Sequence, residues 1–287
     1  MKAAIIYNPR SGKKAAHRIV GIAERLGPEL GADLQLLQVE GPGHGTQLAR
    51  NAVAAGAQRV ISVGGDGTNN AVARGLVGTP VPLGIVAMGS GNGYARSIGL
   101  PLDPERALRH ALTAEARRMD ACYLNDELFL GNAGIGFDAR VAHRFDKSKS
   151  RGMLGYARIV AMEILSAKPM RVVLKANRET SEHHVLMLVF CNTREFGNGA
   201  DISPGSRPDD GVAELRVVRK PSFFPLLKAL FDVYTHRADS NPNLLGITST
   251  EAQVWQEGTW AHLDGEPMEL GHDLRFRLAP KCLWVVG

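Results

Sequence analysis

The stretch RVISVGGDGTNNAVARGL, residues 59–76, decides the fold class that we expect for this chain. Val60, Ile61 and Val63 give residues 59–63 the character of a buried strand, and residues 68–76 have the composition of a helix. The turn between them contains three glycines, and a backbone without Cβ atoms can bend sharply and approach a ligand closely. A strand that enters a helix through such a turn is typical of a parallel sheet with helical crossovers.

The first hundred residues repeat this alternation of strand and helix. We predict strands at residues 2–7, 33–39, 59–63 and 82–88, and helices at residues 13–26, 45–55, 68–76 and 101–117. Ligands of parallel sheets bind beyond the carboxyl ends of the strands. Glycine-containing turns follow the first, third and fourth predicted strands, at residues 8–12, 64–67 and 89–93. These turns are therefore the candidate binding site.

Beyond residue 118 the predicted strands follow one another, mostly without helices between them. They lie at residues 128–130, 171–175, 185–191, 213–218, 252–256, 261–263 and 273–278, with helices at residues 155–167 and 223–235. Strands in direct succession predict a mostly antiparallel sheet. We therefore expect an α/β domain at residues 1–118 and a mostly β domain at residues 119–287.

The composition limits the classes of function. The chain has 287 residues and a net charge of +5, which favours an anionic partner. It shows neither zinc-finger spacing nor an aromatic RNA-binding pattern, so we expect no nucleic-acid partner. The longest apolar run, residues 185–191, suits a buried strand, and residues 1–8 hold too few apolar residues for a secretory leader. We expect a cytosolic protein, with Cys122, Cys191 and Cys282 buried as small hydrophobic side chains.

The turn at residues 64–67 has the properties of a phosphate-binding loop. A helix that begins at a glycine turn directs free N–H groups and the positive end of its dipole toward an anion. Asp66 suits such a place if Mg²⁺ lies between the carboxylate and the phosphate. The structural alternative is a tight turn with Asp66 as the helix cap. Two further glycine turns at the same sheet edge favour the functional interpretation.

Six motifs give the chain a specific resemblance. They are NPRSG (8–12), GGDGT (64–68), GSGN (89–92), GNAGIGFD (131–138), DDG (209–211) and LDGEP (263–267). In this order they resemble the diacylglycerol kinase-like lipid kinases, which include bacterial diacylglycerol kinases and sphingosine kinases. The resemblance covers nearly the whole chain. It implies a Rossmann-like N-terminal domain, a C-terminal β-sandwich, and transfer of the ATP γ-phosphoryl group, with Mg²⁺, to a lipid hydroxyl.

The resemblance also implies roles for individual residues. The nucleotide contacts would come from Asn8, Pro9, Arg10, Ser11, Gly12, Thr46, Gly65, Asp66, Gly67, Thr68, Asn69, Asn70, Ala71 and Ser90. The Mg²⁺ site would fall on the Asp210 side chain with backbone oxygens near Arg207 and Val212, and Asp120 would join Asp66 in a network of water and metal. The proton acceptors would be Asp264 and Glu266.

Some alternatives remain open at this stage. Gly93 stands where many bacterial diacylglycerol kinases have Asp, so diacylglycerol, a sphingoid base and ceramide all remain candidate acceptors. NAD kinases share the Gly-Gly-Asp-Gly-Thr motif, and a catalytically inactive nucleotide- or lipid-binding protein is a further alternative. Asp264-Gly265 is also the commonest two-residue hairpin sequence, so that motif has a purely structural interpretation.

The expected partner is a lipid at a membrane surface. A basic stretch could dock on anionic lipid at the inner face of the membrane, although such a stretch is more often a solvated face. Its members are Arg140, Arg144, Lys147, Lys149, Arg151 and Arg158. Apolar residues at helical spacing between 223 and 234 predict core packing first and a lipid groove second. A homodimer remains possible as an assembly.

Overall fold

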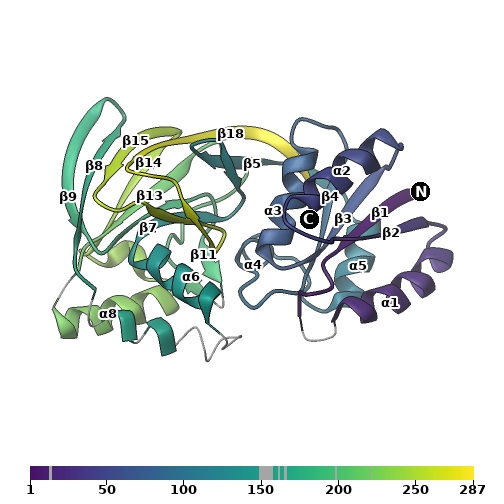
Figure 1. Ribbon diagram of the computed structural model, residues 1–287, viewed down its shortest axis with the longest axis horizontal. Coiled ribbons are helices and arrows are strands. Elements are labelled where there is room, and N and C mark those ends of the chain that lie inside the picture. Colours follow the sequence, from purple (N-terminus) through teal and green to yellow (C-terminus); the bar gives the residue numbers. More distant parts are fainter. Residues whose placement is uncertain (13–14, 149–157, 161, 165–166, 198, 221) are drawn as a thin grey trace. The chain divides into compact units, whose positions relative to one another are not determined.

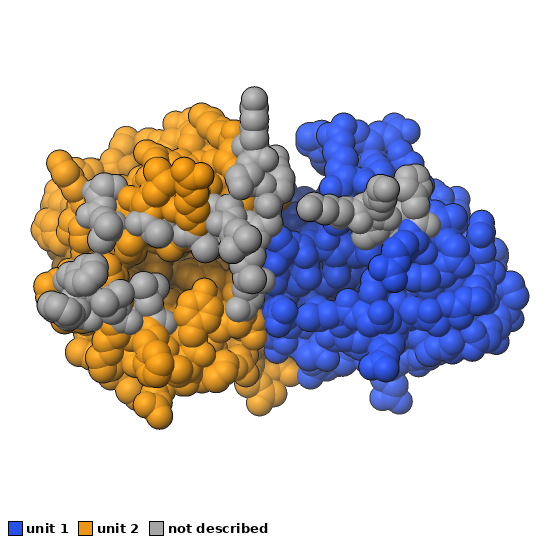
Figure 2. All heavy atoms as spheres, turned by 90° about the horizontal axis from the view of Figure 1, so that it is seen from below, with its two compact units in different colours: residues 1–120, 281–287 blue, residues 121–280 orange. Residues whose placement is uncertain are grey.

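The computed structural model describes residues 1–287 except 13–14, 149–157, 161, 165–166, 198 and 221 (Figure 1). The chain forms two compact units, residues 1–120 with 281–287 and residues 121–280 (Figure 2). The prediction of domains 1–118 and 119–287 assumed a single crossing between domains. In the structure the chain crosses twice, through strand β5 (Ala116–Leu124) and strand β18 (Asp273–Val286).

Unit 1 contains the parallel sheet that the alternating pattern predicts. Its strand order is β2-β1-β3-β4, and every pairing in this series is parallel. The strands are β1 (Lys2–Tyr7), β2 (Asp33–Gln38), β3 (Arg59–Gly64) and β4 (Leu83–Ala87). The far end of β18 adds to the sheet beside β4, where Val285 pairs with Leu83.

Helices cover both faces of this sheet. They are α1 (Ala15–Glu29), α2 (His44–Ala54), α3 (Asp66–Leu76), the short α4 (Gly93–Ser97) and α5 (Pro104–Thr113). Figure 1 shows α1 and α5 on one face and α2 and α3 on the other. The buried side chains of α1 and α5 pack on alternate residues of β1 and β3, as the period of two along a strand requires.

The helix predicted at residues 101–117 is shorter in the structure. Asp103 caps α5 by accepting a hydrogen bond from the Arg106 N–H, and Pro104 occupies the first helical position. The helix ends at Thr113, and β5 begins at Ala116, so Arg117 lies in a strand. Ala, Leu and Arg favour a helix locally, but pairing of β5 with β18 overrides that preference.

Unit 2 is built from two sheets, which confirms the prediction of a mostly antiparallel C-terminal β domain. One sheet has the order β14-β13-β10-β7-β16-β17 with antiparallel pairings. Its strands are β7 (Asn132–Gly136), β10 (Met187–Cys191), β13 (Ala213–Val218), β14 (Leu244–Ser249), β16 (Trp260–Leu263) and β17 (Glu266–Glu269).

The second sheet of unit 2 contains the first part of β18. Its other strands are β5, β6 (Glu127–Phe129), β8 (Met170–Ala176), β9 (Glu179–Val185) and β15 (Glu251–Gln256). Apolar side chains from both sheets form one core, in which Phe190 of β10 stacks on Phe276 of β18 with ring centroids 5.1 Å apart. The remaining described elements are α6 (Phe137–Lys147), the hairpin β11 (Glu195–Gly197) and β12 (Ala200–Asp201), α8 (Phe223–Tyr234) and a 3-10 turn (Ala238–Ser240).

Two predicted strands of unit 2 need correction. The apolar run 185–191 is not one strand, because β9 ends at Val185 and β10 begins at Met187. The last strand does not end at residue 278 but continues to Val286. The sequence did not predict strands β7, β9, β11, β12, β14 and β17 or helix α6. Within the helix expected at residues 155–167, residues 158–160 and 162–164 are helical, and residues 155–157, 161, 165 and 166 lie outside the described part of the chain.

The cysteines differ in burial. Cys122 and Cys191 are buried, and burial raises the pKa of the Cys191 thiol far above its usual range. Cys282 is only half-buried, which corrects the prediction for that residue. Among the described residues, no helix has both the length and the apolar character required to cross a bilayer.

Candidate functional site

Three loops of unit 1 meet at the carboxyl ends of β1, β3 and β4. The Asn8 N–H donates to the Val63 carbonyl (3.0 Å), and the Asn8 Nδ2 donates to the Thr68 Oγ1 (3.3 Å). The Met88 N–H donates to the Gly64 carbonyl (2.7 Å). The turns that the sequence singled out separately therefore form one surface.

Glycines make this meeting possible at two positions. A Cβ on Gly64 would lie 2.5 Å from the Thr68 side chain, and a Cβ on Gly89 would lie 2.8 Å from the Gly65 Cα. Real Cβ atoms do not approach other atoms this closely, so the loops after β3 and β4 contact each other through bare backbone. Gly64 therefore lets Thr68 pack against the end of β3, and Gly65 and Gly89 let the loops after β3 and β4 meet.

Helix α3 begins inside this surface, and its first residue is Asp66. The N-cap is Gly65, which has no side chain to accept the first-turn N–H groups. The alternative in which Asp66 caps the helix is therefore wrong, and the prediction that α3 starts at Thr68 is two residues late. The first turn of α3 presents the positive end of the helix dipole at the place where the three loops meet.

Other residues that were predicted to bind the nucleotide form hydrogen bonds within unit 1 that stabilise this surface. The Ser62 Oγ donates to the Asn69 Oδ1 (2.8 Å) in the protein interior. The Thr46 Oγ1 donates to the Ala71 carbonyl (2.7 Å) and so joins α2 to α3. Both contacts fix the first two turns of α3. Asn70 is also buried.

The loop after β1 is a tight turn. The Asn8 Oδ1 accepts from the Arg10 N–H (3.0 Å), the Asn8 carbonyl accepts from the Ser11 N–H (3.1 Å), and Gly12 has a φ of +66°. Pro9 and Arg10 are exposed on it. Ser90 is exposed on the loop after β4, which the Asn92 Oδ1 closes by accepting from the Gly89 N–H (2.8 Å).

Asp120 lies at the end of unit 1 and is fully buried. Its Oδ1 accepts a hydrogen bond from the Lys281 N–H (2.7 Å), so the carboxylate ties β5 to the returning strand β18. This contact gives Asp120 a structural role that the sequence did not suggest. Its membership in a network with Asp66 stays a prediction.

The predicted Mg²⁺ site lies on an exposed loop of unit 2. The Asp210 Oδ1 accepts from the Val212 N–H (3.1 Å), and Gly211 between them has a φ of +80°. The Arg207 side chain contacts Asp209 instead: its Nε donates to the Asp209 Oδ1 (3.1 Å), and this hydrogen bond to a carboxylate raises the pKa of the Arg207 guanidinium. The Asp210 carboxylate is exposed, and carboxylate and carbonyl oxygens are the donors that Mg²⁺ prefers, so these residue types suit the ion.

A site of this type depends on backbone oxygens more than on clustered side chains. The described residues include no group of three or more His, Cys, Asp or Glu side chains arranged to hold a metal. The Mg²⁺ assignments to Asp66, Asp120, Arg207, Asp210 and Val212 stay predictions.

The turn that joins β16 to β17 contains Asp264 and Gly265. Both have positive φ angles, +49° and +87°, as a two-residue type I′ hairpin requires. The Asp264 Oδ2 accepts from the Leu130 N–H (2.8 Å), and its Oδ1 accepts from the N–H groups of Gly131 (2.8 Å) and Asn132 (3.0 Å). The carboxylate therefore joins two motifs that lie far apart in the sequence, GNAGIGFD and LDGEP.

Glu266 differs from Asp264 in its surroundings. It begins β17 on the exposed side of the same turn, whereas Asp264 is half-buried against residues 130–132. The sequence left these two carboxylates equivalent. The structure separates them by burial and by the backbone donors that Asp264 binds.

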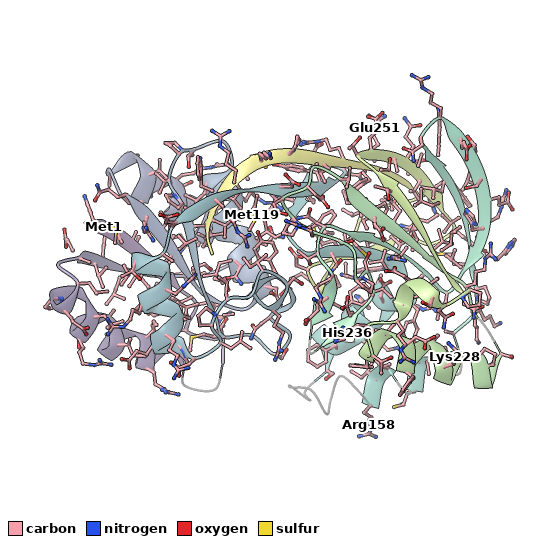
Figure 3. The ribbon with its side chains drawn as sticks, turned by 180° about the vertical axis from the view of Figure 1, so that it is seen from behind. Met1, Met119, Arg158, Lys228, His236 and Glu251 are labelled. Carbon is pink, nitrogen blue, oxygen red and sulfur yellow. The ribbon has the colours of Figure 1, made fainter. Side chains whose placement is uncertain are left out.

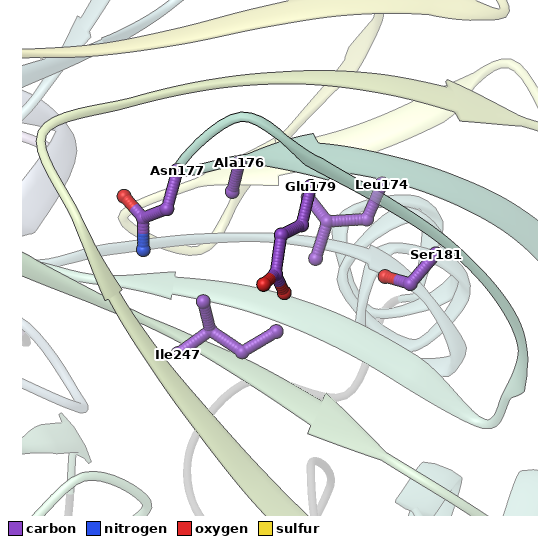
Figure 4. A pocket seen from close by; sticks show the side chains of 6 residues that line it. All are labelled: Leu174, Ala176, Asn177, Glu179, Ser181 and Ile247. Carbon is purple, nitrogen blue, oxygen red and sulfur yellow. The ribbon is translucent and has the colours of Figure 1, made fainter.

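A small hollow on unit 2 lies elsewhere (Figure 4). Its lining residues are Leu174, Ala176, Asn177, Glu179, Ser181 and Ile247. At about 100 Å³ it is well below the roughly 300–1,000 Å³ of ordinary ligand pockets. We therefore assign it no ligand.

The two halves of the chain match two known domain families. Residues 2–124 match the diacylglycerol kinase catalytic domain, and residues 131–287 match the YegS C-terminal NAD kinase beta sandwich-like domain. These matches place the three-loop surface in the first domain and the Asp264–Glu266 turn in the second.

Relatives and solved structures agree with this assignment. A probable lipid kinase YegS-like protein from Chromohalobacter salexigens is 34% identical over 254 residues, which is 84% of this chain and 79% of that protein. One from Cronobacter sakazakii is 28% identical over 95% of both chains. A solved diacylglycerol kinase from Bacillus anthracis str. Sterne has a TM-score of 0.79 at 20% identity, covering 99% of this chain and 96% of that chain, and this likeness establishes the fold. The chain therefore belongs to the YegS-like lipid kinases, a family with a diacylglycerol kinase catalytic domain.

Proposed function

We propose that this kinase binds ATP with Mg²⁺ on the three-loop surface of unit 1 and transfers its γ-phosphoryl group to a lipid hydroxyl. The main support is the start of α3 at Asp66, with an N-cap glycine and two glycine loops in direct contact beside it. This arrangement offers backbone N–H groups and a carboxylate to a phosphate that arrives with a cation. The acceptor is diacylglycerol or a related lipid such as a sphingoid base or ceramide.

Phosphoryl transfer requires mainly positioning and charge stabilisation from the protein. The backbone of residues 64–67 and the first turn of α3 would hold the phosphates, and the Asp66 carboxylate would hold the cation. When bound, Mg²⁺ offsets the negative charge of the phosphates. The contacts from Ser62 to Asn69 and from Thr46 to Ala71 keep the start of α3 rigid, so little reorganisation is needed during transfer.

We assign proton acceptance to Glu266 and an anchoring role to Asp264. The Asp264 oxygens already accept three hydrogen bonds from backbone N–H groups. These donors stabilise the charged carboxylate, and a protonated Asp264 would accept all three hydrogen bonds more weakly, because hydrogen bonds to an ionised acceptor are the stronger ones. Glu266 is exposed at the end of the same turn, where a substrate hydroxyl can approach it.

The proposed membrane contact involves the basic and apolar side chains of unit 2. Arg158 and Lys228 are exposed (Figure 3), and so are Phe231 and Tyr234 of α8. The exposure of Phe231 and Tyr234 corrects the interpretation as core packing for these two residues, whereas Leu226 of the same helix is buried as that interpretation predicts. The side chains of Phe223, Phe224, Leu227 and Leu230, and residues Lys149 and Arg151, lie outside the described part of the chain.

The deciding experiment measures transfer of labelled phosphate from ATP to a panel of lipids in mixed micelles. Diacylglycerol, sphingosine and ceramide are the test acceptors. NAD is the control, because the second domain family is described as NAD kinase beta sandwich-like. We expect one lipid to be labelled in a reaction that stops when EDTA removes Mg²⁺. Labelling of NAD alone, or of no acceptor, would contradict the proposal.

A further inference from the structure

Two buried side chains beneath the Asp264–Glu266 turn have no role in the mechanism described so far. The His262 Nε2 lies 3.1 Å from the Asp138 Oδ2. The His262 side chain is 7% exposed and the Asp138 side chain 9%. His262 belongs to β16, one residue before the strand ends, and Asp138 is the second residue of α6. Burial of this polar pair requires that its hydrogen bonds be satisfied.

The contacts of His262 define which ring nitrogen holds the proton. The Gly265 N–H points to the His262 Nδ1 at 3.3 Å. A backbone N–H can only donate, so Nδ1 must be the acceptor, and the ring proton of the neutral imidazole is on Nε2. Nε2–H then donates to Asp138. The hydrogen bonds therefore run in one direction, from Gly265 through His262 to Asp138.

The sequence makes room for this chain of hydrogen bonds at Gly134. Gly134 pairs with His262 across β7 and β16. A Cβ on Gly134 would lie 1.8 Å from the Asp138 Oδ2 and 2.8 Å from the His262 Nε2. The space that any other residue would fill is thus occupied by the Asp138 carboxylate, which explains a glycine of the GNAGIGFD motif that the mechanism had left without a role.

We propose that Asp138 and His262 form a positioning pair for the turn that presents Glu266. Asp138 selects the Nε2–H form of His262, and the unprotonated Nδ1 holds the Gly265 N–H in the middle of the turn. Asp264 holds the other side of the turn through residues 130–132. The two sets of contacts together fix the direction in which β17 begins, and with it the position of Glu266. This inference rests on the proposed role of Glu266 as proton acceptor.

Two amide substitutions separate the two hydrogen bonds of His262. The Asn side chain places its amide near the position of Nδ1, so His262→Asn keeps an acceptor for the Gly265 N–H and loses the contact with Asp138. The Gln side chain reaches the position of Nε2, so His262→Gln keeps a donor to Asp138 and loses the contact with Gly265. Each variant leaves one buried group without its partner, so we expect similar losses in melting temperature from both.

The kinetic expectation differs between the two variants. His262→Gln should lower kcat at least ~10-fold with KM for ATP unchanged, because a misplaced general base slows the chemical step. His262→Asn should stay within about threefold of the wild type. His184→Gln, at an exposed position of β9, is the matched control and should behave as the wild type. Equal kcat values for the Asn and Gln variants would overturn the proposal.

A spectroscopic test does not depend on activity. Long-range ¹H–¹⁵N correlation spectra of the His262 ring should show a protonated Nε2 and an unprotonated Nδ1 in the wild type. In the wild type the Asp138 Oδ1 accepts a hydrogen bond from the Ala139 N–H (2.8 Å). In Asp138→Asn the amide oxygen keeps this hydrogen bond, so the amide NH₂ group faces the His262 Nε2. The ring proton should move to Nδ1 in that variant. A wild-type ring with its proton on Nδ1 contradicts the positioning pair, even if no lipid is phosphorylated and the proposed function fails.

Discussion

The turns at Asp66-Gly67 and Asp264-Gly265 share a dipeptide but lie in different backbone settings. Asp66 and Gly67 form the first turn of α3, behind a glycine N-cap. Asp264 and Gly265 are both in the left-handed region, and the Asp264 carboxylate binds three backbone N–H groups. The same two residues therefore begin a helix in unit 1, at the proposed phosphate site, and form an anchored hairpin turn in unit 2. The backbone donors available around the aspartate, rather than the dipeptide, decide its role.

The largest effect should follow from Asp66→Ala. We expect kcat to fall roughly 10³-fold, because a preorganised charge beside the phosphates is lost. The melting temperature should stay close to that of the wild type. The measurement is labelled-phosphate transfer at saturating Mg²⁺, with thermal unfolding followed by circular dichroism.

Asp103→Ala is the matched control for Asp66→Ala. Asp103 also lies at a helix start in unit 1, where it caps α5. Its loss should cost about 1 kcal/mol of unfolding free energy and leave kcat unchanged. If Asp66→Ala turns over normally, the nucleotide site is not on the three-loop surface.

Glu266→Gln should have the next largest effect. It keeps the shape of the side chain and removes the charge, so we expect kcat to fall about 10²-fold while KM for ATP is unchanged. Titrations with ATP and with lipid, done separately, measure the two effects. Full recovery of kcat at high ATP would instead assign Glu266 to the nucleotide site.

Asp264→Asn tests whether the second turn is an anchor. Its NH₂ group would face at least one backbone N–H of residues 130–132, so we expect a loss of about 1–3 kcal/mol in unfolding free energy. The loss of kcat should be smaller than in Glu266→Gln. Urea unfolding measures the loss of stability, and the phosphate-transfer assay measures the loss of kcat. An unchanged stability with a larger loss of kcat would make Asp264 the proton acceptor.

Asp210-Gly211 is a third Asp-Gly pair and sharpens the comparison. Its carboxylate accepts one backbone N–H, from Val212, and is exposed. If it also binds Mg²⁺, the wild-type melting temperature should rise by a few degrees with Mg²⁺, because an ion that binds only the folded state stabilises it. Asp210→Ala should melt lower and lose this dependence. If the melting temperature of the wild type does not change with Mg²⁺, the assignment of Asp210 to a Mg²⁺ site is wrong.

We expect the smallest effect for the proposed membrane contact, which involves none of the three Asp-Gly pairs. Activity on lipid vesicles should rise with the content of anionic lipid, and Arg158→Glu should weaken that rise, since a basic residue near the surface contributes about 1 kcal/mol. Arg178→Glu, at the exposed turn between β8 and β9, is the charge-matched control. Equal responses of both variants would show that Arg158 does not face the lipid.

The sequence predicted those parts of the fold that depend on local patterns. Strand β1 and strand β13 have the predicted bounds, and the glycine turns correctly marked the sheet edge. The break at Leu186 was missed, because an apolar run indicates burial but not where a strand ends. Helix α6 was missed because its basic residues were taken only as a charged stretch.

The sequence singled out the loops that meet in unit 1 and the Asp264–Glu266 turn, but not the hydrogen bonds that distinguish the two carboxylates of that turn. The partners of Asp264 are backbone N–H groups more than 130 residues away, and backbone groups are the same for every residue type. A sequence pattern therefore cannot reveal such a contact. The pair of Asp138 and His262 had one visible trace, the glycine at position 134, but its meaning depends on a strand pairing between distant segments.

The return of residues 281–287 to unit 1 has a consequence for the order of folding. The first 120 residues leave the ribosome before the others, and N-terminal domains usually fold first during synthesis. Here the buried Asp120 receives its hydrogen bond from Lys281, and the strand beside β4 is the end of β18. Unit 1 can therefore reach its final structure only after the β-sandwich has been synthesised. Such long-range closure slows folding, and it makes the maturation of the diacylglycerol kinase catalytic domain depend on the completion of the C-terminal β domain.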